Sequence, residues 1–285
     1  MARVSFRSAA SQAEYAVRQL DLESVRTEQN YEQSLKGMAE FLKENRMGDL
    51  RGLDADKATA YLEARSQQVG QKTLDMDRQA IQAVLGEKLE VVKSELDTTL
   101  SSRAYTPEQA ALVAEAQSDK HSLATQIAEN AGLRAHELLT LRPVEERPAD
   151  THRDYRDDRF VGRENVATYT VEGKGGLCRE VAIDRDLANR LEERRLDESK
   201  TIYDRGIGYQ QHYDLGGGKQ WSDSFSKAAE RELGWSQGAH GLRHEYAQER
   251  MNALQEHGYN YQEALEVVSQ EMGHFRPEIT EVYLR

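Results

Sequence analysis

Two β-rich runs inside an otherwise helical sequence are the feature that most limits the folds open to this chain. They lie in "ENVATYTVEGKGGLCREVAID" (164–184) and are separated by Gly-Lys-Gly-Gly, which is a typical hairpin signal. Most other apolar residues follow helical spacing, as Leu35, Met38 and Leu42 do within 27–45. The sequence therefore predicts an α+β fold that is mainly α, with a small β-hairpin or sheet.

A break in this pattern divides the chain into two predicted domains. Small polar residues at about 97–105 precede Thr106-Pro107-Glu108, which places an N-cap, a proline at the first helical position and an acid in the first turn. We predict a helical domain over 1–100, with four or five helices and Asp54 as one N-cap, and a second domain over 101–285.

Within the second domain the sequence predicts helices first and then the hairpin. A further helix is expected over "DLANRLEERRLDE" (186–198), followed by a glycine-rich connection, "YDLGGGKQWSD" (213–223). The stretch "SFSKAAERELG" (224–234) and the remainder are predicted to be helical.

Composition excludes several classes of protein. The formal net charge of -12 argues against a protein that coats nucleic acid indiscriminately, although a local basic groove remains compatible with an acidic body. Cys178 is the only cysteine, which excludes intramolecular disulfides and cysteine-based zinc clusters and fits a reducing cytoplasm. No apolar run approaches the roughly 20 residues that span a bilayer, and the N-terminus lacks a secretion signal.

Four short stretches of the second domain carry side chains that suit phosphate chemistry. In "AGLRAHELLTLR" an arginine is predicted on a helix with Glu137 one turn later, and "VEGKGGLCREV" places a lysine at the hairpin tip. In "HGLRHEY" a histidine and an arginine are spaced i and i+3, and "MGHFRPEITEVY" places a histidine nine residues before a tyrosine. The candidate residues are Arg134, Lys174, His240, Arg243, His274 and Tyr283.

Each stretch alone has a plainer interpretation. An arginine with a glutamate three residues later is usually a surface ion pair, and a Gly-Lys-Gly-Gly turn without the P-loop pattern is usually only a hairpin. A histidine and an arginine at this spacing are most often structural. Tyr283 would belong to a last amphipathic turn that covers the core with Ile279 and Val282.

Taken together and in this order, the four stretches resemble the tyrosine recombinases, the family of phage integrases and bacterial site-specific recombinases. That family carries "GLRxxEL", "GKGxKxR" and "HxLRH", matched here by "GLRAHEL", "GKGGLCR" and "HGLRH". Its "LGH" with a tyrosine nine residues on is matched by "MGH" and Tyr283, while Leu177 replaces a lysine that is common in the hairpin. The resemblance covers most of 106–285, and residues 1–100 resemble the family's helical DNA-clamping domain.

The resemblance implies a site-specific recombinase or integrase that cleaves and rejoins DNA through a covalent 3′-phosphotyrosine. Arg134 and Arg243 would each donate two hydrogen bonds to the non-bridging phosphate oxygens, and His274 would donate another. Tyr283 would attack the phosphorus, with His240 as the base that removes its proton. Lys174 would protonate the leaving 5′ oxygen. The sequence shows no Walker motif, carboxylate cluster or metal-ligand spacing, so neither a cofactor nor a metal is expected.

The resemblance also implies partners. We expect double-stranded DNA carrying a specific attachment or recombination site, with Lys72 and Arg78 of the first domain among the DNA-binding residues. Subunits would assemble on DNA as a homo-oligomer, a tetrameric synapse, helped by accessory DNA-bending proteins. With only two residues after Tyr283, we expect little association without DNA. The protein would serve a mobile element, a phage or chromosome resolution, in the cytoplasm and on the bacterial nucleoid, with no membrane.

Two alternatives stay open. The first is a catalytically idle DNA-binding or regulatory protein that keeps the fold, which the acidic charge favours. The second is a DNA-relaxing topoisomerase of type IB chemistry, which shares the mechanism without site specificity.

Overall fold

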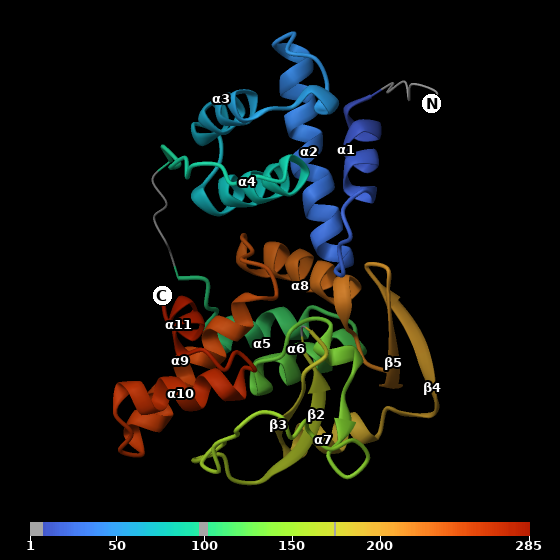
Figure 1. Cartoon of the computed structure of the whole chain (residues 1–285). Coiled ribbons are helices and arrows are strands. Elements are labelled where there is room, and N and C mark those ends of the chain that lie inside the picture. Colours follow the sequence, from blue (N-terminus) through green and yellow to red (C-terminus); the bar gives the residue numbers. More distant parts are fainter. Residues whose placement is uncertain (1–7, 97–101, 174) are drawn as a thin grey trace. The chain divides into compact units, whose positions relative to one another are not determined.

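The computed structural model describes residues 8–96, 102–173 and 175–285. The chain divides into two compact units, Met1–Thr99 and Leu100–Arg285, which are considered separately below. The predicted fold class is confirmed, because helices dominate and the strands form small antiparallel sheets (Figure 1). Of the predicted linker, residues 97–101 lie outside the described residues, whereas Tyr105 already packs in the core of the second unit.

In its described part the first unit contains helices joined by loops and no strand, as the sequence predicts. Asp54 caps a helix by accepting a hydrogen bond from the backbone N–H of Lys57 at 2.9 Å. Leu35, Met38 and Leu42 are fully buried on one helix face, which is the face that their spacing indicates. The elements are α1 (Ala9–Arg18), α2 (Val25–Glu44), the 3-10 helix η1 (Leu50–Gly52), α3 (Ala55–Ser66) and α4 (Gln71–Leu85).

The second unit combines helices with two antiparallel sheets. Its first helix begins at the predicted cap, since Thr106 and Gln109 form a capping box. The elements up to the second hairpin are α5 (Pro107–Glu115), α6 (Asp119–Ala131), η2 (Glu137–Leu139), β1 (Arg142–Pro143), β2 (Val166–Glu172), β3 (Cys178–Asp184) and α7 (Arg185–Glu192). The remaining elements are β4 (Arg195–Asp204), β5 (Ile207–Tyr213), α8 (Gly218–Leu233), α9 (Gly241–Glu256), α10 (Tyr261–Glu271), α11 (Pro277–Thr280) and η3 (Glu281–Tyr283).

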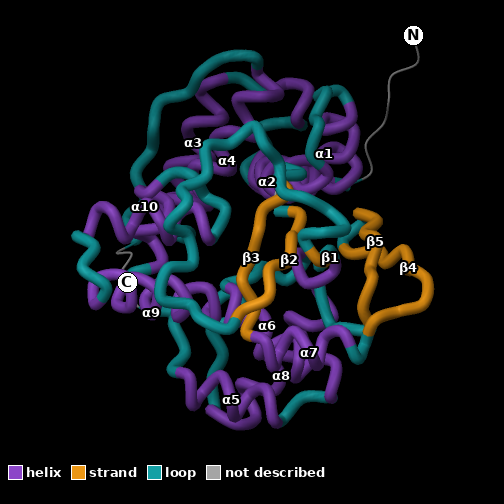
Figure 2. The backbone as a smooth tube through the Cα atoms, turned by 90° about the horizontal axis from the view of Figure 1, so that it is seen from below, coloured by secondary structure: helices purple, strands orange, loops and turns teal. Residues whose placement is uncertain are grey.

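The predicted hairpin over 164–184 is confirmed as strands β2 and β3. They pair antiparallel in a sheet of order β1-β2-β3, and their register sets Glu172 opposite Cys178 at the turn (Figure 2). Gly173 and Gly176 close that turn through the hydrogen bond from Gly176 N–H to the Gly173 carbonyl oxygen, 3.2 Å long.

The helix predicted over 186–198 is wrong in its second half. Helix α7 ends at Glu192, and β4 begins at Arg195 within the expected helix and pairs with β5 as a second hairpin, which is not among the predicted elements. Arg205 and Gly206 both have positive φ, 51° and 82°, which is the geometry of a two-residue type I′ turn. The β-branched and aromatic residues on either side of this turn were the missed strand signal.

Helix α8 also begins earlier than predicted. It starts at Gly218 inside the glycine-rich connection, where the sequence predicts a helix only from residue 224. The carboxylate of Asp204, at the end of β4, accepts a hydrogen bond from the backbone N–H of Lys219 at 2.8 Å. A residue distant in sequence thus satisfies one of the unpaired N–H groups of the first helical turn.

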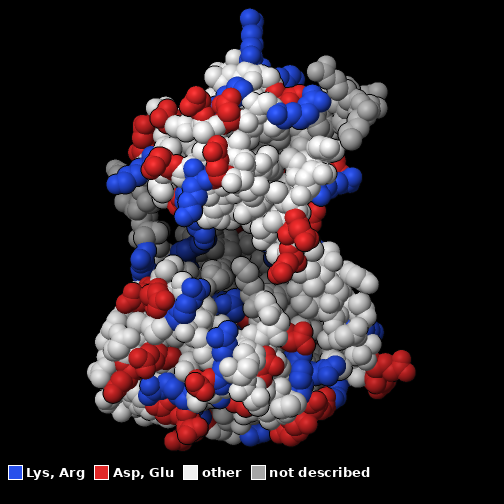
Figure 3. Space-filling model, viewed as in Figure 1, with Lys and Arg blue, Asp and Glu red and all other residues white. Residues whose placement is uncertain are grey.

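Helix α9 joins the two hydrophobic clusters of the second unit. Leu242 packs in the larger cluster with residues of α5, α6, α8 and the strands, while Met251 and Leu254 pack against α10. Acidic and basic side chains are interspersed over the face of the molecule shown in Figure 3, as expected of solvated helix faces. Among the described residues, none of the helices has the length and apolar character needed to cross a membrane.

Candidate active site

The first predicted arginine lies in a turn and not on a helix, so that prediction is wrong. Helix α6 ends at Ala131 because Gly132 adopts a left-handed backbone, with φ 60°. A Cβ on Gly132 would also lie 2.5 Å from the Tyr246 ring, so glycine is required there for two reasons. Arg134 follows in the connection to η2, and its backbone N–H donates to Glu137 Oε2 at 2.7 Å.

Glu137 is a fully buried carboxylate shared by three arginines. Arg134 donates from Nη1 to Oε1 at 2.8 Å, and Arg179 donates from Nη2 to Oε2 at 3.0 Å. Arg243 Nη1 lies 3.8 Å from the same Oε2. Burial alone would raise the pKa of Glu137, but the three guanidinium charges hold it below the usual range. The interpretation of this glutamate as half of a surface ion pair is therefore wrong.

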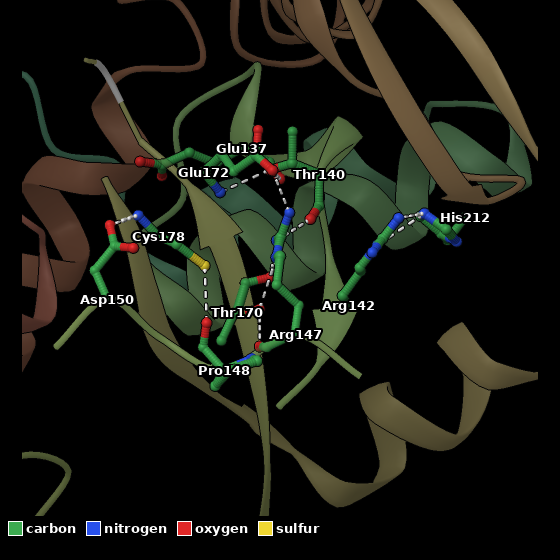
Figure 4. Close-up of polar contacts among 10 residues, drawn as sticks. All are labelled: Glu137, Thr140, Arg142, Arg147, Pro148, Asp150, Thr170, Glu172, Cys178 and His212. Atoms are coloured by element: carbon green, nitrogen blue, oxygen red, sulfur yellow. Dashed lines mark hydrogen bonds and ion pairs between the residues drawn. The ribbon is translucent and has the colours of Figure 1, made fainter. Parts of the chain in front are cut away.

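A polar network fixes the backbone that carries Glu137 to strand β2 (Figure 4). Arg147 donates to Thr170 Oγ1 at 3.1 Å and to Glu172 Oε1 at 2.6 Å, and it also donates to the carbonyl oxygen of Thr140. The Thr140 hydroxyl donates to the Glu137 carbonyl oxygen at 3.0 Å and accepts from the Glu172 N–H at 2.9 Å. The short helix η2 is thus fixed to the end of β2 next to the hairpin turn.

Arg243 is held without exposed surface in the first turn of α9. Its Nη1 donates to the carbonyl oxygen of Gly132, and its Nη2 donates to that of Met272 at 3.1 Å. Its Nε has no hydrogen-bond partner among the described residues. Burial and then Arg134 lower the pKa of Arg243 to about 10, so the guanidinium remains charged at neutral pH.

His274 is a neutral imidazole whose two ring nitrogens are both engaged. Because arginine offers no acceptor, His274 Nε2 must accept from Arg243 Nη2 at 3.1 Å, and Nδ1 must carry the proton that it donates to Thr280 Oγ1 at 2.9 Å. Burial and then Arg243 lower the pKa of His274 well below its usual range. The imidazole lies between two left-handed residues, Gly273 with φ 72° and Phe275 with φ 54°.

Tyr283 lies among histidines and over an arginine. Its side chain is nearly buried, with 9% of its surface exposed. The centroid of its ring is 5.0 Å from that of His274 and 5.3 Å from that of His240, and the guanidinium carbon of Arg243 lies 5.6 Å from it. Gln248 Nε2 donates to the Tyr283 carbonyl oxygen at 3.2 Å, so the segment is anchored to α9.

The interpretation of Tyr283 as part of a core-covering amphipathic turn is met only in part. Tyr283 does belong to the cluster formed by α9 and α10, with Leu284 packed against it. Ile279 and Val282, however, are 36% and 46% exposed and do not cover that cluster. The tyrosine is therefore buried because of its neighbours in the site rather than because of an apolar helix face.

Two histidines at the start of α9, one at its N-cap and one in its first turn, lie beside the tyrosine ring. His240 precedes the helix and is exposed on one side, and partial desolvation followed by the charge of Arg243 lowers its pKa to about 4. His244 is 5% exposed, and the centroid of its ring lies 4.7 Å from that of Tyr283, which is closer than His240. His244 Nδ1 is buried with no hydrogen-bond partner among the described residues.

The structure thus brings Arg134, His240, Arg243, His274 and Tyr283 together in the second unit. Lys174 lies outside the described residues.

The two predicted DNA-binding residues, Lys72 and Arg78, lie on α4 in the first unit. Lys72 is exposed, whereas the Arg78 guanidinium donates to Gln82 at 3.0 Å and lies 3.5 Å from Asp75. The side chain of Arg78 is therefore engaged along its own helix, and Lys72 is the freer of the two.

Three residues of the site have no role in the sequence-based assignment. The spacing of Glu137 from Arg134 predicts only an ion pair between these two residues, although Glu137 is the carboxylate that three arginines share. Arg179 was visible only as the last letter of "GKGGLCR", and His244 as the last letter of "HGLRH". Both residues stand inside motifs of the family, but only their contacts with distant segments show that they belong to the site. Among the described residues, no group of three or more His, Cys, Asp or Glu side chains is placed to hold a metal ion.

Three solved structures with a similar fold are those of a site-specific recombinase and two integrases. The chain matches XerH site-specific recombinase bound to palindromic difH substrate with a TM-score of 0.61 and 13% identity, over 97% of this chain and 90% of that one. It matches the Tn1549 transposon integrase in complex with transposon right end DNA with a TM-score of 0.58 and 14% identity, over 98% and 95%. A lambda integrase tetramer bound to a Holliday junction gives 0.59 and 14%, over 96% and 76%.

At the level of sequence no protein-family model and no curated protein matches this chain. The likeness is therefore one of three-dimensional structure, and it extends over nearly the whole chain in each comparison. The chain has the fold of the tyrosine recombinases and integrases.

Proposed function

We propose that this chain is a site-specific DNA recombinase that cleaves and rejoins DNA strands through Tyr283. The observation that carries the proposal is the convergence of Arg134, Arg243, His274 and Tyr283: the two arginines share one buried carboxylate, and the histidine and the tyrosine lie against Arg243. They come from segments separated by up to about 150 positions in the sequence, and a packing role alone does not require phosphate-directed groups at one place.

The arginines would bind the non-bridging oxygens of the cleaved phosphodiester. Arg134 keeps 22% of its side chain exposed and is reachable from solvent, whereas Arg243 is fully buried with the Tyr283 ring against it. A phosphate would therefore reach Arg243 only when that ring moves aside, which also carries the hydroxyl toward an attacking position. Loss of one such donor typically lowers the rate ~10²–10³-fold.

Proton transfer would use the neutral histidines. A tyrosine hydroxyl ordinarily has a pKa of about 10, so a tyrosine nucleophile needs a base. His240 is neutral at physiological pH because its pKa is lowered to about 4, and His244 is a second candidate because it lies closer to the ring. Lys174 would protonate the leaving 5′ oxygen. A bound phosphate would raise the pKa of His274 and let its Nε2 donate to the phosphate.

The partners follow from the proposal. Double-stranded DNA with a specific recombination site would be the substrate, and the first unit would act as a clamp with Lys72 as a phosphate contact. The similar solved structures are described as DNA complexes, one of them a tetramer on a Holliday junction, which supports assembly on DNA as a homo-oligomer. We place the reaction in the cytoplasm, on the DNA of a mobile element, a phage or the chromosome.

An idle DNA-binding protein with the same fold is the second candidate. The observation that favours it is the engagement of the Arg243 Nη groups and of both His274 nitrogens within the protein. An active enzyme must release these contacts when DNA binds, whereas an idle protein never does.

A covalent-trapping experiment separates the two candidates. A DNA site is first recovered by selecting randomised duplexes that the protein binds, and nicked suicide substrates are then built on it. The parent protein is expected to form an adduct that survives denaturation, mapped by peptide analysis to Tyr283. The Tyr283→Phe variant should bind the site as well as the parent and form no adduct, whereas Tyr261→Phe, at an exposed tyrosine of α10, should react normally.

Other outcomes decide against the proposal. Binding without any adduct by the parent protein would support the idle alternative. An adduct mapped to another residue, or one that persists in Tyr283→Phe, would remove Tyr283 as the nucleophile.

A further inference from the structure

A pocket of about 550 Å³ opens beside the candidate active site. His274 and Phe275 line one side, and the described residues of the hairpin tip, Gly175, Gly176 and Leu177, line another. The rest of the wall comes from the segment that precedes β2, where Arg153 lies, and from Arg276 before α11. The pocket therefore shares His274 with the candidate active site and extends from it toward the hairpin.

Two arginines with no acidic partner face this pocket. Arg153 and Arg276 are both exposed, and among the described residues neither forms an ion pair with a carboxylate. The one carboxylate in the wall, that of Asp150, already accepts from the Cys178 N–H at 2.8 Å and lies 4.0 Å from His152 Nδ1. In a chain of net charge -12, two unpaired guanidinium groups around one pocket indicate an anionic ligand.

The wall of the pocket is held in an unusual backbone conformation. Phe275 has a φ of 54°, which is rare for a bulky residue and has to be stabilised by its surroundings. Its ring packs edge-on against Tyr155, with 5.2 Å between centroids, and the guanidinium carbon of Arg153 lies 5.5 Å from the ring centroid. Arg153 is therefore placed by a contact with the same loop that carries His274 and Arg276.

We infer that this pocket binds a backbone phosphate of the DNA strand that leaves on cleavage, one nucleotide beyond the cleaved bond. The inference rests on the proposed function, in which Lys174 protonates the leaving 5′ oxygen. Gly175, the next residue in the chain, lines the pocket, so the pocket lies on the hairpin side of His274, where the leaving strand would continue. Arg153 and Arg276 then bind that strand through charge-assisted hydrogen bonds.

A chemical double-mutant cycle tests this contact. Duplexes carry a neutral methylphosphonate at one position, either one nucleotide beyond the cleaved bond on the leaving strand or one nucleotide before it on the retained strand. The Kd of the parent protein, of Arg153→Gln and of Arg276→Gln is measured for each duplex by fluorescence anisotropy at one fixed salt concentration. Arg190→Gln is the matched control, since Arg190 is an exposed arginine that lines a different pocket of the same unit.

The expected result is non-additivity at one phosphate only. The methylphosphonate on the leaving strand and the Arg153→Gln substitution should each weaken binding about 10- to 100-fold, and their combination should weaken it no further. The same pattern is expected for Arg276→Gln, while Arg190→Gln should change the Kd less than about twofold.

Two results would overturn the inference. In the first, the fold-losses in affinity caused by the substitution and by the leaving-strand methylphosphonate multiply, as independent effects do. In the second, the two effects are non-additive for the methylphosphonate on the retained strand instead. The adduct of the parent protein locates the cleaved bond, and a parent protein that forms none refutes the proposed function itself. Because the readout here is binding, a parent protein that forms the adduct but shows no non-additivity refutes only this contact. A failure of the proposed chemistry is thereby distinguished from a failure of this contact.

Discussion

Glu137 is the residue whose neutralisation should disturb the candidate site most. Glu137→Gln keeps the size of the side chain and removes the one carboxylate that, among the described residues, contacts the three buried or half-buried guanidinium groups. Breaking a buried ion pair on one side typically costs about 3–5 kcal/mol of folding free energy, because the remaining charge stays buried without a partner. We expect a loss of that size.

The pH dependence of this loss has a definite sign. The pKa of Glu137 is depressed below its ordinary value of 4.5, so its carboxylate stabilises the folded state fully above that pH and progressively less as the pH falls through the folded-state pKa. The difference between the parent and Glu137→Gln should therefore be constant from about pH 5.5 to 8 and shrink in more acidic solution.

Urea unfolding followed by tryptophan fluorescence measures this loss in the correct part of the chain. Both tryptophans, Trp221 and Trp235, lie in the second unit, so the signal reports on the unit that contains Glu137. The control is Glu172→Gln, which neutralises a carboxylate that also pairs with an arginine but is 48% exposed, and it should cost less than about 1 kcal/mol. Equal losses in the two variants would refute the reasoning that Glu137 balances the buried arginines.

Three further predictions concern single positions. Glu245 is buried, and one of its oxygens has no hydrogen-bond partner in the part of the chain that the structure describes. Burial followed by neighbouring glutamate charges raises its pKa to about 9, so the folded state keeps this proton and becomes less stable as the pH rises from 4.5 to 9. Thermal unfolding at pH 8 should show Glu245→Gln more stable than the parent by about 1–3 kcal/mol, with no gain near pH 4.5. Gly273→Ala adds a Cβ 2.6 Å from Arg179 Nε at a φ of 72° and should lower the Tm clearly more than Gly258→Ala, where φ is 91° and the space is open. His240 should titrate near pH 4 in an NMR experiment on the DNA-free protein, and an observed pKa at or above its ordinary value of 6.5 would contradict the lowering by partial desolvation and by Arg243.

Local signals in the sequence were enough for most elements. Caps are decided within one helical turn, so Asp54 and Thr106 could be placed from the residues beside them. The hairpin of β2 and β3 is equally local, because its turn and its alternating strands lie within about 20 positions. Six candidate residues could be named because their motifs keep their order along the chain, and the structure brings five of them together.

The remaining features depend on contacts between distant segments. Whether Glu137 is on the surface or buried is decided by Arg179 and Arg243, which lie 42 and 106 positions further along the chain. The early start of α8 depends on Asp204 of β4, and the second hairpin has an Arg-Gly turn in place of the commoner Asn-Gly signal. No pattern in a single segment carries this information.

The shared carboxylate has a consequence for the energy of the reaction. Among the described residues of the DNA-free site, three guanidinium groups around one carboxylate leave two uncompensated positive charges, since the nearby His240 and His274 are neutral. A phosphodiester brings one negative charge, and the five-coordinate phosphorus formed by nucleophilic attack carries two. The second negative charge would thus develop on oxygens beside the arginines, while the proton of Tyr283 passes to His240, so the attraction between the arginines and the phosphate oxygens grows on the way to the transition state. Interactions that strengthen only on the way to the transition state are those that raise kcat. By neutralising one of the three arginine charges, Glu137 would weaken the binding of the substrate phosphate and leave positive charge for the second negative charge that forms during the reaction.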